Sequence, residues 1–245
     1  MLLNRHDYHE FSTHTYGVGH QILSTSAFDE HEIEVGAQLL ATRRHNFGDG
    51  VVAIDGGANI GVHTVEWART MHGWGRIISF EAQERIFYAL AGNITLNNCF
   101  NAKAVWAAVG GQSGEIRAPA PDYLVPSSFG SLELRRTAAT EDIGQPIDYS
   151  DEKTSPIRLV AIDDMQLDRL DFIKLDIEGM EIEALAGAER SIDAFRPQLM
   201  IEVIKSDEVA IRAFLERLNY RLFPIGLNLL AIHESDPAVN QVTMV

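Results

Sequence analysis

An acid and several glycines follow an apolar run near residue 50, in a spacing that could hold a charged nucleoside ligand. Residues 51–54 are all apolar, and the motif D-x-G-x-N-x-G comes directly after them at residues 55–61. An uninterrupted apolar run is typical of a strand buried on both faces, and the glycines predict a tight turn that brings backbone close to a ligand. Apolar residues at steps of three from Val62 then predict a helix.

The spacing of this turn distinguishes between cofactors. Dinucleotide-binding turns need G-x-G-x-x-G with a helix N-terminus aimed at a pyrophosphate, and the turn at 55–61 lacks that pattern. Asp55 would repel a pyrophosphate but suits a cationic ligand, and Asn59 tolerates left-handed backbone angles. The turn is similar to the D-x-G-x-G-x-G signature of S-adenosylmethionine-dependent methyltransferases, whose cofactor carries a sulfonium and an ammonium. A structural turn without any ligand is the alternative.

A second carboxylate ends the next expected strand. Residues 76–80 predict another buried strand, and Glu81 closes it, where a carboxylate can bind both hydroxyls of a ribose. A solvated glutamate at a strand end is the alternative. Because two strand-end acids occur in consecutive β-α units, one of them beside a glycine turn, we interpret them as parts of one cofactor crevice.

A lysine and an aspartate occur in a later strand that should be apolar. In the strand expected over 171–176, alternation places Lys174 and Asp176 on one face. Ligands of doubly wound sheets bind outside the carboxyl ends of the strands, so this pair predicts a site. Glu178 and Glu181 follow at the start of the next helix, where the helix dipole favours carboxylates. Alternatively, both glutamates only cap that helix while Lys174 and Asp176 form an internal ion pair.

The elements that position these residues alternate between strands and helices. Strands are expected at 51–55, 76–81, 103–109, 158–162, 171–176 and 198–203, with one or two more in 220–233; helices are expected at 29–40, 62–72, 85–98, 207–219 and from Met180 to Ile192. Such alternation predicts an α/β fold with a parallel sheet and helices on both faces.

A single domain over residues 1–245 is expected, because 245 residues with 46% hydrophobic content can bury one large core. Its predicted parts are a cap segment (residues 1–50), a cofactor-binding half (51–110), an insertion (111–156), the second half of the sheet (157–233) and a loose tail (234–245). The insertion is proline-rich and polar, which favours a lid or substrate loop.

Composition excludes several classes of partner. The chain has 20 basic and 35 acidic residues, a net charge of −15 that repels nucleic acids. No apolar run is long enough to span a membrane, and the first residues lack a signal peptide's apolar core, so we expect a cytoplasmic protein. The lone Cys99 excludes an internal disulfide framework and is interpreted as a packed thiol. A homo-oligomer is compatible with this composition.

The block K-L-D-I-E-G-M-E at residues 174–181, together with the 55–61 turn and Glu81, resembles the FkbM family of S-adenosylmethionine-dependent methyltransferases. The resemblance covers roughly residues 51–205, and residues 162–164 resemble the family's T-x-D strand. This chain departs from the usual pattern in having Ala82-Gln83 after Glu81, where relatives often carry a proline, and Ala161 where threonine is common. Neither departure involves the cofactor acids.

The resemblance implies a doubly wound, Rossmann-like methyltransferase fold, with transfer commonly to a hydroxyl of a sugar or polyketide-type product. It also implies that S-adenosylmethionine lies in the 55–61 turn and on Glu81. The predicted cofactor contacts are Asp55, Gly56, Gly57, Ala58, Asn59, Gly61, Thr64, Glu81 and Ala107.

Methyl transfer to oxygen is an in-line displacement, so the protein must hold the acceptor and remove its proton. Asp176 is the first candidate, either as general base or as a ligand of a divalent cation such as Mg²⁺, with Glu178 and Glu202 as further oxygen ligands. Lys174 could keep Asp176 ionised or contact the acceptor. His63 is an alternative base.

The acceptor is expected to be a small or glycosylated molecule methylated on oxygen. Strand 171–176 does not end in the Asn/Asp-Pro-Pro-Tyr/Phe sequence of nitrogen-methylating enzymes. Two other classes stay open: a nicotinamide-dependent oxidoreductase or epimerase, and a non-catalytic cofactor-binding module.

Overall fold

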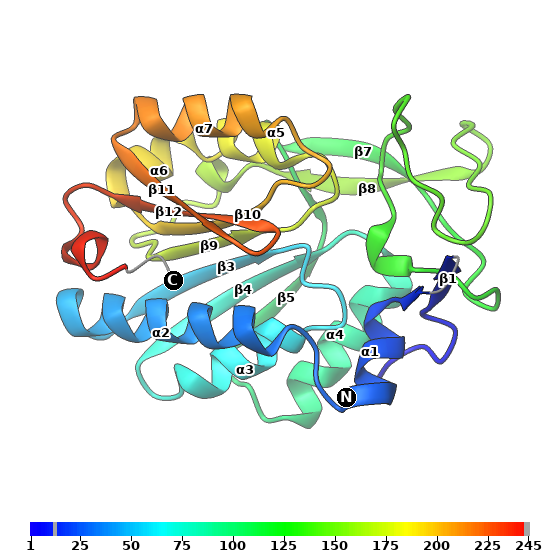
Figure 1. Cartoon of the computed structure of the whole chain (residues 1–245), viewed down its shortest axis with the longest axis horizontal. Helices are drawn as coiled ribbons and strands as arrows, with labels where there is room; N and C mark the ends of the chain where they lie inside the picture. The colour runs from blue at the N-terminus through cyan, green and yellow to red at the C-terminus, as the bar shows by residue number, and fades with distance from the viewer. Residues whose placement is uncertain (12–13, 243–245) are drawn as a thin grey trace.

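A seven-stranded sheet forms the centre of the computed structural model, which describes residues 1–11 and 14–242 (Figure 1). Its strands, in spatial order, are β11 (Tyr220–Ile225), β12 (Asn228–His233), β10 (Gln198–Glu202), β9 (Phe172–Leu175), β3 (Val51–Gly56), β4 (Gly75–Glu81) and β5 (Ala102–Trp106). All neighbouring pairs from β10 to β5 are parallel, whereas β12 runs antiparallel to β10 and to β11. The predicted mostly parallel sheet is confirmed.

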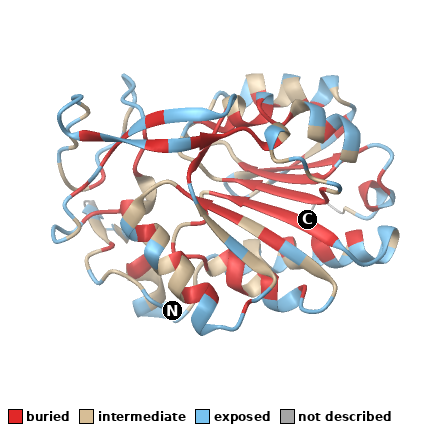
Figure 2. Ribbon diagram, turned by 180° about the vertical axis from the view of Figure 1, so that it is seen from behind, coloured by how far each residue is buried: buried red, intermediate tan, exposed pale blue. Residues whose placement is uncertain are grey.

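Helices cover both faces of this sheet. The helices α2 (Glu30–Phe47), α3 (Val62–Thr70) and α4 (Glu84–Leu96) lie on one face, and α5 (Glu181–Ala186), α6 (Glu189–Phe195) and α7 (Glu208–Arg217) lie on the other (Figure 1). Strand β3 faces two cores: Ile54 packs with Leu185, and Ala53 packs in a second cluster with Trp67. The strands therefore form a buried layer (Figure 2), which explains their unbroken apolar runs.

The chain after β5 leaves the central sheet. The predicted strand 103–109 is wrong in its second half, because β5 ends at Trp106 and β6 (Ala108–Val109) joins a separate three-stranded sheet. That sheet also contains β7 (Gly114–Pro119) and β8 (Thr154–Val160), so the insertion is ordered at both ends. The predicted strand 158–162 corresponds to the end of β8. An apolar run alone does not reveal that two of its residues pair with a different sheet.

Two further predictions need correction. The helix expected from Met180 to Ile192 is two helices, α5 and α6, which are separated at Gly187 and Ala188. Gly187 ends α5, and glycine has low helix propensity; a Cβ there would also lie 2.2 Å from the carbonyl oxygen of Gly110. The tail is not loose in its described part: it forms a 3₁₀ turn (Pro237–Asn240) in which Val239 is buried. Residues 243–245 lie outside the described residues.

The cap segment lies beside the insertion in the part that precedes α2 (Figure 1). It contains β1 (His9–Phe11), β2 (His14–Tyr16), α1 (Val18–Thr25) and α2, while a 3₁₀ turn (Phe129–Ser131) lies within the insertion. The buried carboxylate of Asp7 accepts hydrogen bonds from the backbone N–H of Gly19 (3.0 Å) and of Phe129 (3.1 Å). The bond from Phe129 joins the cap segment to the insertion.

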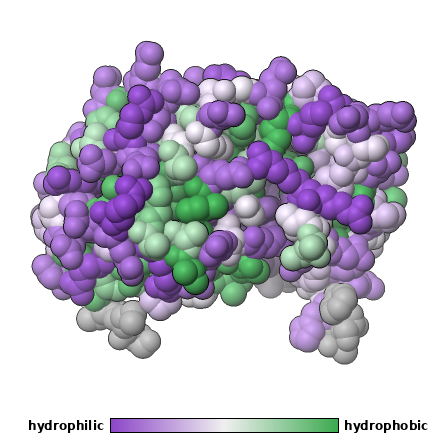
Figure 3. All heavy atoms as spheres, turned by 90° about the horizontal axis from the view of Figure 1, so that it is seen from above, coloured by the Kyte–Doolittle hydropathy of each residue, from purple (hydrophilic) through white to green (hydrophobic). Residues whose placement is uncertain are grey.

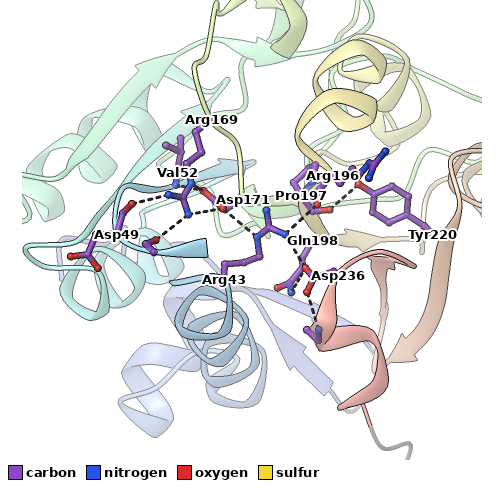
Figure 4. A network of polar contacts seen from close by, with 12 residues as sticks. Arg43, Asp49, Val52, Arg169, Asp171, Arg196, Pro197, Gln198, Tyr220 and Asp236 are labelled. Carbon is purple, nitrogen blue, oxygen red and sulfur yellow. Dashed lines mark hydrogen bonds and ion pairs between the residues drawn. The ribbon is translucent and has the colours of Figure 1, made fainter. Parts of the chain in front are cut away.

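A buried ionic network fixes helix α2 at the amino end of the strands (Figure 4). The Arg43 guanidinium contacts Asp171, just before β9, at 3.2 Å and Asp236, next to the 3₁₀ turn at 237–240, at 2.9 Å. Arg169 adds a second contact to Asp171 at 2.7 Å. Anchored there, α2 brings Glu32 in its first turn to Lys174 near the carboxyl end of β9.

Cys99 is buried, which confirms the interpretation as a packed thiol. Among the residues that the structure describes, no helix is both long and apolar enough to cross a membrane.

Candidate functional site

A cavity of about 290 Å³ opens at the carboxyl ends of β3, β4 and β9. The 55–61 turn, the end of β4 and residues 107–109 form one part of its wall, and the chain from 174 to 180 forms another. The cap segment and the insertion contribute residues 16–29 and 128–134, and Val62, His63 and Glu202 also line the cavity. The cavity therefore lies where ligands of doubly wound sheets bind.

The glycine turn brings bare backbone into the cavity wall. Gly57 has φ +79°, and a Cβ there would lie 1.7 Å from the carbonyl oxygen of Asp176, so no larger residue fits. Asn59 has φ +50°, the left-handed angle expected from its residue type. Gly57, Ala58 and Asn59 line the cavity. Gly56 and Gly61 do not line the cavity. The missing side chain leaves room for Leu175 at Gly56 and for Leu90 at Gly61.

Asp55 and Thr64 lie behind the wall, although the sequence predicted both as cofactor contacts. Both are fully buried; the Thr64 hydroxyl donates to Asp55 Oδ2 at 2.6 Å and is also hydrogen-bonded to the Ser79 hydroxyl at 2.8 Å. Burial raises the pKa of Asp55, and its Oδ1 has no hydrogen-bond partner among the described residues. This geometry supports an indirect role for Asp55 and Thr64. The turn residues Gly57, Ala58 and Asn59 line the cavity, and Asp55 and Thr64 do not.

Glu81 lines the cavity with both carboxylate oxygens held by the backbone. Its Oε2 accepts the N–H of Asn59 at 2.9 Å, and its Oε1 accepts the N–H of Gln83 at 2.8 Å. Burial raises its pKa to about 7, against the opposing effect of these N–H donors. Each oxygen has a second lone pair that a ligand hydroxyl can use. Ala107, another predicted contact, lies in the apolar wall nearby.

Lys174 and Asp176 form an ion pair at the other part of the wall. The Lys174 ammonium, 1% exposed, lies 2.8 Å from Asp176 Oδ2. Burial opposes its charge, but Asp176, Glu32 and Asp55 together raise the pKa of Lys174 above its ordinary value. Lys174 is therefore a fixed cation held against the Asp176 carboxylate.

Glu32 belongs to this site and was not foreseen from the sequence. Its Oε1 lies 3.8 Å from the Lys174 ammonium and 3.5 Å from His63 Nε2, while its Oε2 accepts the side-chain N–H of Asn228 at 3.1 Å. Asp29, the N-cap residue of α2, lines the cavity beside it. Acids at a helix start normally indicate capping, so only the long-range packing of α2 reveals these contacts.

His63 lines the cavity as a buried, neutral side chain. Its ring packs edge-on against Trp67 with centroids 5.1 Å apart, and against Phe28 at 6.1 Å. Burial, and secondarily Lys174, lowers its pKa well below the ordinary value. The structure thus places this candidate base in the cavity wall, with its Nε2 directed to Glu32.

Asp176, Glu178 and Glu202 form an acid cluster in which ligand oxygens lie within 4.8 Å of one another. Burial and the charge of Asp176 raise the pKa of Glu178 to about 7 and that of Glu202 to about 8. Three carboxylates are a donor set that suits Mg²⁺ or Ca²⁺. The structure therefore brings together all three residues predicted for a cation.

The two glutamates after β9 have different surroundings, and neither caps α5, which begins after Met180 without a side-chain cap. Glu181 accepts the backbone N–H of Ile177 at 2.8 Å and of Gly179 at 3.1 Å, and Ser206 donates to it. Glu178 instead lines the cavity and pairs with Lys205 at 2.6 Å. Lys205, in the chain after β10, was not foreseen from the sequence because no motif accompanies it.

The fold and this cavity define an α/β methyltransferase, as comparisons with known proteins confirm. The chain belongs to the FkbM methyltransferase family, since the model described as "Methyltransferase FkbM domain" matches residues 55–222. A comparison with curated proteins found no match. Family membership favours methyl transfer over the nicotinamide chemistry that the sequence left open.

Solved structures support the fold. Methyltransferase FkbM from Methylobacillus flagellatus KT is 21% identical with a TM-score of 0.51, and the match covers 76% of this chain and 43% of that one. Monomeric WbdD is 11% identical with a TM-score of 0.50, covering 89% of this chain and 44% of WbdD. The chain therefore spans less than half the length of either structure.

Proposed function

We propose that the protein transfers a methyl group from S-adenosylmethionine to a hydroxyl of a sugar or small natural-product acceptor. The observation that carries the proposal is that Asp176, paired with the buried Lys174, opens on the same cavity as the glycine turn and Glu81. A carboxylate that can take an acceptor proton thus shares one enclosed space with a nucleoside-binding wall.

The residues present fit this cofactor. Glu81 would accept hydrogen bonds from the two ribose hydroxyls, and the backbone of Gly57 to Asn59 would lie against the amino-acid part of the cofactor. Ala82, Ala107 and Val109 are apolar wall residues that suit the flat adenine ring. When bound, the cofactor supplies an electrophilic methyl group on its sulfonium.

The chain's own groups then have distinct roles in the transfer. Asp176 accepts the proton of the acceptor hydroxyl, while the contact with Lys174 holds that carboxylate in position. Leu132 and Leu134 of the insertion and Val18 and Phe28 of the cap segment enclose the cavity and limit access of water. Enclosure also holds the acceptor near the line of displacement.

The acid cluster supports a second role for Asp176, as a ligand of a divalent cation that acidifies the hydroxyl. Chelator separates the two roles. Loss of turnover that magnesium restores would favour a cation held by Asp176, Glu178 and Glu202, and indifference to chelator would favour direct proton transfer.

The test is transfer of a labelled methyl group to a panel of monosaccharides, glycosides and small polyhydroxylated molecules. Asp176→Asn should lower turnover by about 10²-fold or more, the scale of a lost general base, without weakening cofactor binding. The matched control is Asp168→Asn, an exposed acid eight residues earlier, which should retain activity. Full activity in Asp176→Asn, or a product methylated on nitrogen, would contradict the proposal. Binding without turnover on the whole panel would favour a non-catalytic module.

We propose a small or glycosylated acceptor rather than a nucleic acid, in the cytoplasm. The charge of −15 supports this choice, and the face of the molecule drawn in Figure 3 is mostly hydrophilic around a central group of apolar side chains. A lone cysteine is typical of a reducing compartment.

A further inference from the structure

We propose that Gln83 couples the cofactor site to the insertion, so that a ligand on Glu81 orders the insertion over the cavity. This makes Gln83 a positioning residue, and the inference rests on the cofactor site proposed above. Gln83 belongs to the pair Ala82-Gln83 after Glu81, a place where relatives often carry a proline.

Gln83 is tied to Glu81 through its backbone. The Gln83 N–H donates to Glu81 Oε1 at 2.8 Å. The direction of the carboxylate and the backbone position of Gln83 therefore depend on each other.

The side chain of Gln83 is tied to the insertion. Gln83 is the N-cap residue of α4, yet its side chain does not cap that helix. Its Nε2 donates instead to the carbonyl oxygen of Phe129 at 2.8 Å, and its Oε1 accepts the Tyr123 hydroxyl at 3.1 Å. Both ends of one amide are thus used on two residues of the insertion.

Those two residues hold the part of the insertion that encloses the cavity. Phe129 is fully buried, packs on Tyr123 with ring centroids 5.0 Å apart, and donates its N–H to Asp7 of the cap segment at 3.1 Å. Its neighbours Ser128, Gly130 and Ser131 line the cavity. Fixing Phe129 therefore fixes the cover contributed by the insertion, and through Asp7 the adjoining cap segment.

A continuous chain of contacts thus runs from the ligand position to the cover. Ligand hydroxyls bound to Glu81 would fix its carboxylate, and the carboxylate is hydrogen-bonded to the Gln83 backbone N–H. The Gln83 side-chain amide in turn is hydrogen-bonded to Phe129 and Tyr123. Removing the Gln83 amide breaks this chain at one point and leaves the bond between its N–H and Glu81 in place. S-adenosylhomocysteine affinity should fall by about tenfold, the scale of one or two lost hydrogen bonds.

The experiment is hydrogen–deuterium exchange with and without S-adenosylhomocysteine. In the wild-type chain the ligand should slow exchange both in the 55–61 turn and in residues 120–134. In Gln83→Ala it should still slow exchange in the turn but no longer in 120–134. Gln112→Ala, at an exposed glutamine between β6 and β7, is the matched control and should behave as wild type.

If Gln83→Ala does not fold, Tyr123→Phe tests the same link, because it removes only the hydroxyl that donates to Gln83. Tyr123→Phe should reduce the ligand-induced protection of residues 120–134. Wild-type-like protection of 120–134 in a folded Gln83→Ala chain that binds the ligand would overturn the inference alone. Failure of the wild-type chain to bind S-adenosylhomocysteine would overturn the proposed function as well.

Discussion

Glu81 and Asp176 lie in different parts of one cavity wall, and each has a distinct chemical task in the proposed reaction. Glu81→Ala removes the acceptor of the ribose hydroxyls. Calorimetry should show S-adenosylhomocysteine binding weakened by roughly 1–3 kcal/mol, the scale of a lost hydrogen bond to a charged group. Glu115→Ala, at an exposed position of β7, serves as the control. Unchanged affinity in a folded Glu81→Ala chain would refute the ribose assignment.

Glu32 offers a second test at the scale of single residues. Its carboxylate lies near both Lys174 and His63, so Glu32→Gln removes one charge beside these two wall residues while the Lys174–Asp176 contact stays in place. Turnover should fall by about 3- to 30-fold, less than expected for loss of a general base. Cofactor affinity should not change. Glu34→Gln, on the exposed side of the same helix, should match wild type in steady-state kinetics. Equal rates for the two variants would exclude a role for Glu32.

At the scale of elements, the position of α2 depends on Arg43. Arg43→Met leaves the buried carboxylates of Asp171 and Asp236 without this partner, although Arg169 still contacts Asp171. The free energy of unfolding should fall by about 3–5 kcal/mol, as for other broken buried pairs. Arg44→Met breaks an exposed pair with Asp49 and should cost about 0–1 kcal/mol. Urea denaturation compares the two, and equal losses would contradict the anchoring role.

The strands buried on both faces were predictable because both of their faces contact the apolar core, which leaves a run of apolar residues in the sequence. Strands β3 and β10 contain unbroken apolar runs that end at an acid, β4 and β9 are mostly apolar, and the structure confirms all four as strands of the buried sheet. The division between β5 and β6 could not be predicted, because the same apolar run serves two sheets.

The candidate site was predictable where a charged side chain occurs in a strand that is otherwise buried and apolar. Lys174 and Asp176 were found because charged residues in a buried strand require an explanation. Glu32 and the Gln83 amide were not found, because their partners are far away in sequence and neither residue is unusual for its own element.

At the scale of the whole molecule, the acidic cavity should make stability depend on pH. Burial and neighbouring carboxylates raise the pKa of Glu81 and Glu178 to about 7 and that of Glu202 to about 8, against an ordinary 4.5. A raised pKa means that the folded state binds the proton more tightly, so this stabilisation is present below pH 4.5 and is lost as pH rises through 7–8. The pKa of His63 is lowered, so its contribution makes stability rise with pH, but only below about pH 6.5.

The melting temperature of the ligand-free protein should therefore fall as pH rises from about 6.5 to 8.5. Glu202→Gln should flatten this slope, because it removes the carboxyl with the highest of these three pKa values. Scanning calorimetry at matched ionic strength measures both. A melting temperature that rises over this range would show that these carboxyls are not protonated in the folded state.

The account as a whole places one cofactor between Glu81 and Asp176. A crystal structure with S-adenosylhomocysteine bound tests this most directly. We predict the ribose hydroxyls on the Glu81 carboxylate, the amino-acid part along Gly57 to Asn59, and the sulfur facing the space beside Asp176. A ribose bound away from Glu81, or a sulfur separated from Asp176 by the protein chain, would contradict the account.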